Sequence, residues 1–419
     1  MNSNTHYPNF TGLILFGFAS LAGLIYGFEL GIIGFGVQQI DNIYAFSSFN
    51  LSIIAGMELW GATVSIIFAG IVADKIGRIK TLVVSSIVFM FGSTLLVNSD
   101  TYNMFLMSRL VQGIGLGGII MITPLYLSEV SMPKVRGRNI TCFQLFVTIG
   151  ILVSYIIGGM SEDLAIYYYV PILIALAFIL LGRFVPRDNI SVERKEELSE
   201  PINWRFCIKP LFIALSIALL NQMVGLIPII QYAPIILKSD HMSSNLSIYI
   251  GLANFVFTAL AMFFIDHAGR KPLLAIGTAG SCLSMVFLMI ISVMKLDNQI
   301  MTTLGAGTFL ASFALGPGVV VWLAISEILP TPIRSKGMSV CLFLNMFVAC
   351  LYSSVFLEIK QLIGYGNVFM IFAVAGLLYF IISVFFLPET KGKTLEEIQE
   401  GFQTSRKSLL SSLLIRLKP

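Results

Sequence analysis

Apolar stretches of about 20 residues follow one another along the whole chain and are separated by short polar segments. A helix needs about 20 apolar residues to cross a hydrocarbon core about 30 Å thick. We therefore expect an all-α polytopic membrane protein. The pattern predicts twelve spans, at residues 11–37, 50–73, 80–97, 103–127, 139–160, 165–185, 209–237, 246–266, 272–294, 300–328, 336–358 and 366–387.

The overall composition agrees with this pattern. Of the 419 residues, 57% are hydrophobic and only 11% are charged, whereas about 25% are charged in soluble domains. The mean hydropathy is +0.89. The first apolar stretch is longer than the apolar core of a signal peptide and has no basic flank before it, so we expect it to be retained as the first span.

Basic residues predict the orientation of the spans. With both termini in the cytoplasm, inner loops and the C-terminal tail hold 22 of the 26 lysines and arginines. Lys238, Lys295 and Lys360 then fall outside, and Arg109 lies within a span. Cytoplasmic loops of membrane proteins carry an excess of positive charge, so the pattern favours cytoplasmic termini.

Two loop sequences occur twice. "DKIGR" at 74–78 returns as "DHAGR" at 266–270, and "SEVSMPKVR" at 128–136 returns as "SEILPTPIR" at 326–334. Parallel repeats of this kind are typical of transporters that rock around a central site. The repeats predict an N-terminal six-helix half at 1–185, a cytoplasmic linker at 186–208, a C-terminal half at 209–387 and a cytoplasmic tail at 388–419.

Three charged residues lie in the interior of predicted spans, namely Glu29, Glu58 and Arg109. A charge at the centre of a bilayer costs about 2.5–3.5 kcal/mol on insertion scales. With a rise of 1.5 Å per residue, all three lie about 10–12 Å below the outer edge of the bilayer. Their shared depth predicts a buried ion network, although Glu58 could instead face water.

Four segments resemble the sugar porters of the major facilitator superfamily. They are "GIVADKIGRIK" (70–80), "VQGIGLGGIIMITPLYLSEVSMPKVR" (111–136), "GPGVVVWLAISEILP" (316–330) and "LPETKGKTLEEIQ" (387–399). The resemblance implies a major facilitator fold that imports a monosaccharide (a hexose or pentose) or a related polyol with a proton by alternating access. It also implies a monomer in the bilayer of a cell membrane, either inner or plasma.

The resemblance assigns a role to two of the buried charges. Proton-coupled sugar porters carry an aspartate at the position of Glu29 and an arginine at the position of Arg109, so these residues become the candidates for proton coupling. Glu58 matches no motif of the family and is a further candidate. The alternative is a static buried pair with a structural role.

The resemblance also implies a sugar site built from amides and one indole, at Gln144, Asn221, Gln222, Trp322 and Asn345. Amides both donate and accept hydrogen bonds, which suits uncharged ligands rich in hydroxyls, and an aromatic face suits the C–H side of a sugar ring. The alternative is hydrogen bonding between helices. Ile227 and Gln231 depart from the family motif, which leaves the particular sugar open.

The resemblance also implies that charged residues at the predicted cytoplasmic helix ends form a cytoplasmic latch, which holds the two halves in the outward-open state. Carboxylates and guanidiniums there can pair in bidentate geometry, and the alternative is that they only set the topology. The residues are Asp74, Arg78, Glu129, Arg136, Arg138, Asp266, Arg270, Glu327 and Arg334.

Other function classes have little support in the sequence. It offers no nucleophile–base pair and no cluster of metal ligands, so we expect neither an enzyme nor a cofactor or metal. The segment "GIGLGG" (113–118) has the letters of a dinucleotide fingerprint but lies within an apolar span, and no nucleic-acid partner is expected. A facilitative sugar uniporter and a transporter-like sugar sensor remain as alternatives.

Overall fold

The computed structural model describes residues 8–130, 133–185, 204–236, 243–296, 298–393 and 397–398, and these residues form helices and short connections without any β-strand. In the first half of the chain the helices are α1 (Pro8–Tyr44), α2 (Ser48–Ile76), α3 (Arg78–Val97), α4 (Tyr102–Val130), α5 (Pro133–Met160) and α6 (Leu164–Gly182). In the second half they are α7 (Trp204–Met223), α8 (Leu226–Ile236), α9 (Ser243–Ala268), α10 (Arg270–Val293), α11 (Gln299–Leu315), α12 (Pro317–Ile328) and α13 (Thr331–Phe385).

Eleven helical segments in the described part of the chain are long and apolar enough to span a membrane. The last of these segments belongs to α13, which has 55 residues and would be about 80 Å long if straight. Gly364 interrupts α13 with φ 77° and ψ 161°, a conformation that glycine adopts readily. Two helical segments therefore meet end to end at Gly364.

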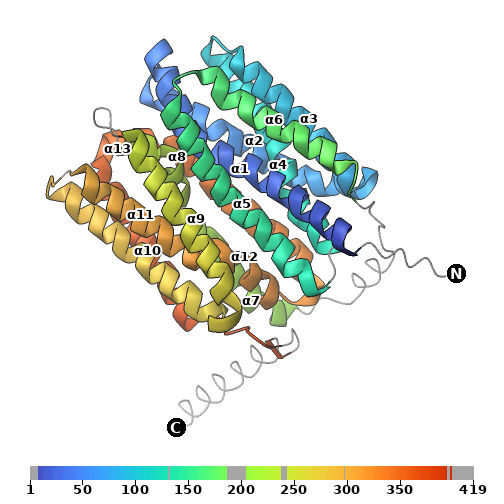
Figure 1. The fold of residues 1–419 in the computed structure, drawn as a ribbon. Helices are drawn as coiled ribbons and strands as arrows, with labels where there is room; N and C mark the ends of the chain where they lie inside the picture. The colour runs from blue at the N-terminus through green and yellow to red at the C-terminus, as the bar shows by residue number, and fades with distance from the viewer. Residues whose placement is uncertain are drawn as a thin grey trace, which may run out of the picture.

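The helices form two bundles that lie side by side (Figure 1). Helices α1–α6, coloured blue to green, make up one bundle, and α7–α13, coloured yellow-green to red, make up the other. The repeated loop has the same backbone in both, because Gly77 has φ 93° and Gly269 has φ 92°. The sequence repeat is thus also a repeat of conformation.

Glycines allow helices within the first bundle to pack with their backbones in contact. A Cβ atom at Gly27 of α1 would lie 1.9 Å from the carbonyl oxygen of Val147 on α5. A Cβ atom at Gly113 of α4 would lie 1.9 Å from the carbonyl oxygen of Glu58 on α2. Small residues favour such close packing in membranes, where lipid gives apolar side chains little reason to associate.

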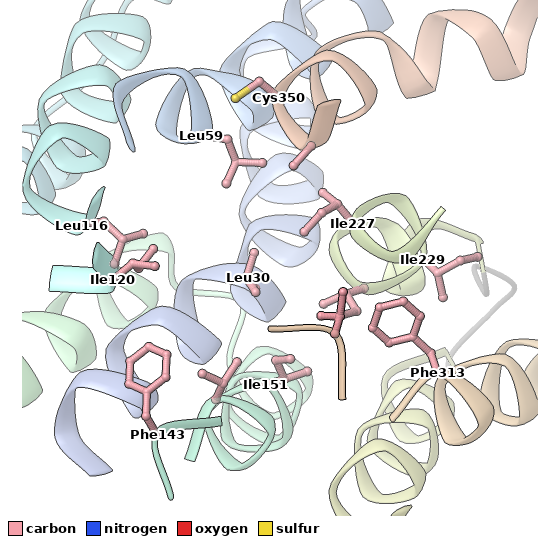
Figure 2. Close-up of a cluster of buried hydrophobic side chains, with 14 of the residues drawn as sticks. Leu30, Leu59, Leu116, Ile120, Phe143, Ile151, Ile227, Ile229, Phe313 and Cys350 are labelled. Carbon is pink, nitrogen blue, oxygen red and sulfur yellow. The ribbon is translucent and has the colours of Figure 1, made fainter. Parts of the chain in front are cut away.

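The two bundles touch at the end that the sequence predicts to face outward. Trp60 Nε1 of α2 donates to Ser354 Oγ of α13 at 3.0 Å, and Tyr155 Oη of α5 donates to the carbonyl oxygen of Ile230 of α8 at 2.7 Å. Buried apolar residues of both bundles belong to one cluster, which includes Leu30 and Ile227 (Figure 2). The halves are therefore in close contact at this end.

Two predicted spans of the second bundle are broken helices. The span predicted at 209–237 divides into α7 and α8 at Gly225, which has φ +89°. The span predicted at 300–328 divides into α11 and α12 at Gly316, before Pro317. Each of the two stretches still forms one candidate span, Cys207–Ile236 and Gln299–Ile328. Broken helices expose backbone polar groups near the membrane centre, where transporters place their substrate sites.

Candidate functional site

The three charged residues predicted inside spans meet in the first bundle. Arg109 Nη2 of α4 lies 2.6 Å from Glu58 Oε2 of α2, and Arg109 Nη1 lies 3.3 Å from Glu29 Oε2 of α1. Their exposed fractions are 0% for Arg109, 1% for Glu29 and 2% for Glu58. One guanidinium therefore serves two carboxylates that are shielded from solvent.

Gln112 and Ser93 complete this buried network. Arg109 Nη1 donates to Gln112 Oε1 at 2.8 Å, and Gln112 Nε2 donates to Glu29 Oε1 at 2.9 Å and to Ser93 Oγ at 2.9 Å. Sequence reasoning missed Gln112 and Ser93. The available signal was the position of Gln112 three residues after Arg109, which places both side chains on one face of α4.

Some polar atoms of the network remain without a hydrogen-bond partner among the described residues. They are Glu58 Oε1 and Arg109 Nε, together with the hydroxyl of Tyr168 on α6, which lies close enough to interact electrostatically with the three charges. Buried polar groups are normally paired. Polar atoms without a hydrogen-bond partner beside two carboxylates are expected in a site whose hydrogen bonds and ion pairs change during function.

Two of the amides proposed for the sugar site, Gln222 beside the break between α7 and α8 and Asn345 on α13, meet in the second bundle. Gln222, in the last turn of α7, donates through Nε2 to Asn345 Oδ1 of α13 at 3.0 Å, and Asn345 Nδ2 donates to the carbonyl oxygen of Ala218 at 2.9 Å. Gln222 Oε1 is buried without a partner among the described residues. The structure therefore brings Gln222 and Asn345 together and leaves an acceptor available.

The other predicted sugar contacts are not joined to this pair by a described hydrogen bond. Asn221 Oδ1 accepts a hydrogen bond from Tyr379 Oη at 3.4 Å. Gln144 on α5 and Trp322 on α12 are half-buried. Within the described ranges neither makes a hydrogen bond to Gln222 or Asn345. The structure thus places the five residues on four different helices.

The departures from the family motif are also buried. Ile227 of α8 is 1% exposed and presents an apolar side chain where the motif has an amide. Gln231 Oε1 accepts from Ser353 Oγ of α13 at 2.5 Å, and Tyr232 Oη donates to the Ser353 carbonyl oxygen at 2.7 Å. Both departures face the interior, so they alter the chemistry of the bundle and not its surface.

The described ion pairs of the candidate latch each lie within one half. Arg78 pairs with Asp74 at 2.7 Å, and Arg270 pairs with Glu327 at 3.3 Å. Arg334 Nε donates to the carbonyl oxygen of Leu329 at 3.2 Å. The remaining members have side chains outside the described part of the structure, namely Glu129, Arg136, Arg138 and Asp266.

Glu389, just after α13, caps the start of α10. Its carboxylate accepts hydrogen bonds from the backbone N–H groups of Arg270 and Lys271 at 3.1 Å and of Thr390 and Lys391 at 2.9 Å. Burial alone would raise the pKa of Glu389, but these four backbone donors hold that pKa below its usual value. The cap satisfies N–H groups that a helix start leaves free.

We expect Glu389→Gln to lower the melting temperature (Tm) of the detergent-purified protein at pH 7 by about 2 °C, because a neutral amide is a weaker acceptor for four N–H groups. The lowered pKa means that the charged cap stabilises the fold above the ordinary glutamate pKa of about 4.3. This contribution is lost as pH falls through the folded-state pKa.

The Tm difference from the wild type should therefore shrink below about pH 4. Thermal unfolding followed by fluorescence at several pH values measures it. Glu162→Gln, at an exposed acid between α5 and α6, is the matched control and should leave Tm unchanged. A Tm difference for Glu389→Gln that does not depend on pH would contradict this account of the cap.

Comparison with known proteins agrees with the fold. A helical membrane bundle with broken helices and a buried ion network defines a secondary transporter as the class of protein. The family described as "Sugar (and other) transporter" matches residues 15–202 and, in a second match, residues 187–402. The chain therefore belongs to this family, the sugar porters of the major facilitator superfamily, and is a transporter and not an enzyme.

Curated relatives match over nearly their full length. The galactose-proton symporter of Escherichia coli (strain K12) is 26% identical over 438 residues, which is 93% of this chain and 94% of that protein. The arabinose-proton symporter of Bacillus subtilis (strain 168) is 26% identical over 439 residues, which is 91% of this chain and 93% of that protein.

Solved structures show the same fold. A crystal structure of a D-xylose-proton symporter has a TM-score of 0.80 at 22% identity and covers 91% of this chain and 99% of its own. The xylose transporter of E. coli in an inward-open conformation has a TM-score of 0.80 at 23% identity, with 93% and 99% covered. The chain thus has the major facilitator fold of these transporters.

Proposed function

We propose that this protein imports a monosaccharide, a hexose or pentose, or a related polyol together with a proton by alternating access. The observation that carries the proposal is the buried pair of Glu29 and Arg109, with the Nη1–Oε2 distance of 3.3 Å. Burying a carboxylate this deep in a membrane bundle costs free energy, and ionisable residues in membrane spans are typically functional. Relatives named as proton symporters of galactose and arabinose support the same reading.

In this proposal Glu29 carries the proton and Arg109 is its partner. Protonation of Glu29 in the outward-facing state weakens its attraction to Arg109, and the neutralised, sugar-loaded carrier can turn inward. Release of the proton inside restores the pair. The close contact of the two halves at the predicted outer end, through Trp60 and Ser354, is what an inward-facing state requires.

The proposed sugar site lies at the helix breaks, with Gln222 and Asn345 at its centre and Gln144, Asn221 and Trp322 around them. The free acceptor Gln222 Oε1 suits a sugar hydroxyl. The charged residues at the cytoplasmic helix ends would bias the carrier between its inward-facing and outward-facing states.

The proposed topology has twelve spans and cytoplasmic termini. In this scheme α13 supplies the last two spans, which meet at Gly364, and the halves are 1–185 and 209–387. We further propose that the carrier works as a monomer in a cell membrane.

Uptake of radiolabelled sugars into reconstituted vesicles tests the proposed function. The panel should contain hexoses, pentoses and polyols, each measured with and without an inward proton gradient. Accumulation above the outside concentration only with the gradient supports symport. Equilibration that does not respond to the gradient would establish the uniporter alternative, and failure to move any member of the panel would exclude sugar transport.

We expect Gln222→Ala and Trp322→Ala to weaken binding of the transported sugar about tenfold or more, since each removes a ligand contact worth at least about 1.4 kcal/mol. Binding to detergent-purified protein is measured by calorimetry. Asn367→Ala is the control, because Asn367 is exposed and its described hydrogen bond goes to the nearby carbonyl oxygen of Ile363, within α13. Unchanged affinity in both site variants would show that the sugar binds elsewhere.

A further inference from the structure

The two carboxylates that share Arg109 come from helices that are packed in different ways. Glu58 lies on α2 and approaches Arg109 to 2.6 Å, whereas Glu29 lies on α1 and approaches it to 3.3 Å. Each ion pair can change during a transport cycle only as far as its two helices can move apart. The packing of α1 and of α2 against α4 therefore decides which pair is fixed.

Helix α2 is interlocked with α4 at the ion pair and over the turns that follow it on both helices. Added Cβ atoms would lie 1.9 Å from the carbonyl oxygen of Glu58 at Gly113, 2.3 Å from that of Leu110 at Gly61, and 2.4 Å from that of Ala62 at Gly117. The two backbones are therefore in direct contact beside Glu58 and one turn from Arg109. These helices cannot separate at Arg109 without losing this packing.

Helix α1 is interlocked with α5 instead. Added Cβ atoms would lie 2.4 Å from the carbonyl oxygen of Phe143 at Gly23 and 1.9 Å from that of Val147 at Gly27. Glu29 reaches α4 through side-chain contacts, to Arg109 at 3.3 Å and to Gln112 at 2.9 Å. Side-chain contacts of this kind can break while the backbone packing of α1 on α5 is kept.

The charge balance requires one carboxylate that stays ionised. With both acids ionised the network carries one net negative charge, and with one acid protonated it is neutral. If Arg109 had Glu29 as its sole counter-ion, protonation of Glu29 would leave a buried positive charge, which is strongly unfavourable. A second, permanent acid removes this barrier.

We infer that Glu58 is the fixed counter-ion of Arg109, held by the α2–α4 packing, and that Glu29 is the exchangeable partner, so that a proton on Glu29 makes the network neutral. This inference rests on the proposed proton coupling. Among the described residues, the hydroxyls of Tyr26 on α1, Tyr168 on α6 and Tyr232 on α8 interact electrostatically with these charges. Cys350 on α13 interacts with Tyr26. In their ordinary protonated forms these groups carry no charge.

The variant Glu58→Gln tests the inference. With Glu58 neutral, protonation of Glu29 leaves the charge of Arg109 without a counter-ion. A more acidic pH is therefore needed to protonate Glu29. We expect the pH of half-maximal proton-driven uptake to move to a more acidic value by about one pH unit. A merely structural role of Glu58 would lower the amount of folded protein without moving this pH profile. Glu162→Gln is the control for the loss of one acid and should keep the wild-type profile.

The double variant Glu58→Gln/Arg109→Gln restores the charge balance. It again has one net negative charge that protonation of Glu29 neutralises. Its half-maximal pH should return to a more alkaline value than that of Glu58→Gln alone. A half-maximal pH that stays at the value of the single variant would overturn the inference.

Thermal unfolding supplies a readout that does not depend on transport. In Glu58→Gln, acid protonates Glu29 and removes the last counter-ion of Arg109, which keeps only its neutral partner Gln112. The Tm deficit of this variant should therefore grow between pH 8 and pH 5, and the double variant should abolish that growth. If Glu58→Gln is too unstable to purify, the double variant should still fold because it holds no unmatched arginine, and its failure to fold would count against the inference.

The outcomes separate this inference from the proposed function. Absence of proton-driven accumulation in the wild type would exclude symport, and the Tm measurements would still test the assignment of Glu58. If Glu58→Gln keeps the pH dependence of uptake and of Tm that the wild type shows, the assignment of Glu58 is overturned. Loss of coupling in Glu58→Gln together with retained coupling in Glu29→Gln would reverse the roles of the two acids.

Discussion

Glu29→Gln is expected to abolish proton-driven accumulation of sugar while sugar exchange across the membrane continues. A gradient of one pH unit corresponds to about 1.4 kcal/mol, which sustains about tenfold accumulation if one proton accompanies each sugar. The variant should reach an inside-to-outside ratio of about one under the same gradient. The expected effect is therefore the complete loss of concentrative uptake.

The reason is that glutamine resembles protonated glutamate permanently. Glu29 is 1% exposed and shares its two oxygens between Arg109 and Gln112. A neutral amide at this position can still pack and accept hydrogen bonds, so the fold and the sugar site persist. It cannot release a proton on the inner side, so the gradient no longer drives the return of the empty carrier.

Reconstituted vesicles provide both measurements on one preparation. Uptake against a gradient reports coupling, and exchange of labelled for unlabelled sugar reports movement of the loaded carrier. Glu162→Gln, which removes an exposed acid outside the helices, should behave as the wild type in both assays. Concentrative uptake by Glu29→Gln would remove Glu29 as the coupling residue and make Glu58 the next candidate.

Gly113→Ala is expected to impair folding strongly, although it adds only one methyl group. The new Cβ would lie 1.9 Å from the carbonyl oxygen of Glu58, so α2 and α4 would have to move apart at the ion pair. Forcing extra atoms into a close-packed contact costs about 1–3 kcal/mol, and more where backbone must shift. We expect a marked loss of monodisperse protein in detergent and a Tm several degrees lower.

Gly307→Ala is the matched control. A Cβ atom at Gly307 of α11 would have no neighbour within 4 Å, and alanine is favoured over glycine inside a helix by about 0.5–1 kcal/mol. This variant should be as stable as the wild type or slightly more stable. Equal stability of the two variants would mean that the close α2–α4 contact does not constrain the fold.

Much of the fold follows from the hydrophobic pattern, because lipid contact and burial both require apolar side chains. The predicted boundary between the last two spans, at 359–365, contains Gly364, where the structure interrupts α13. The predicted repeat of "DKIGR" and "DHAGR" recurs as equal backbone angles at Gly77 and Gly269. The free-energy cost of a charge within a membrane span also identified Glu29, Glu58 and Arg109 as residues that need partners.

The helix breaks and the neutral residues of the ion network depend on which helices become neighbours. The hydropathy pattern carries no information about that. Gly225 and Gly316 lie in apolar stretches that look continuous, so the breaks after α7 and α11 were not foreseen. Gln112 and Ser93 are neutral and inexpensive to bury, so they carried no comparable signal. Their role emerges only when α1, α3 and α4 converge on one point.

The contact of Trp60 with Ser354 gives the protein an optical reporter of its own conformation. The indole N–H donates across the two halves at 3.0 Å, and the ring packs edge-on against Phe347 with 5.6 Å between centroids. When the outer end opens, this indole loses both contacts and meets water, which shifts its emission to longer wavelength. With only three tryptophans in the chain, the intrinsic fluorescence can follow alternating access without an attached dye.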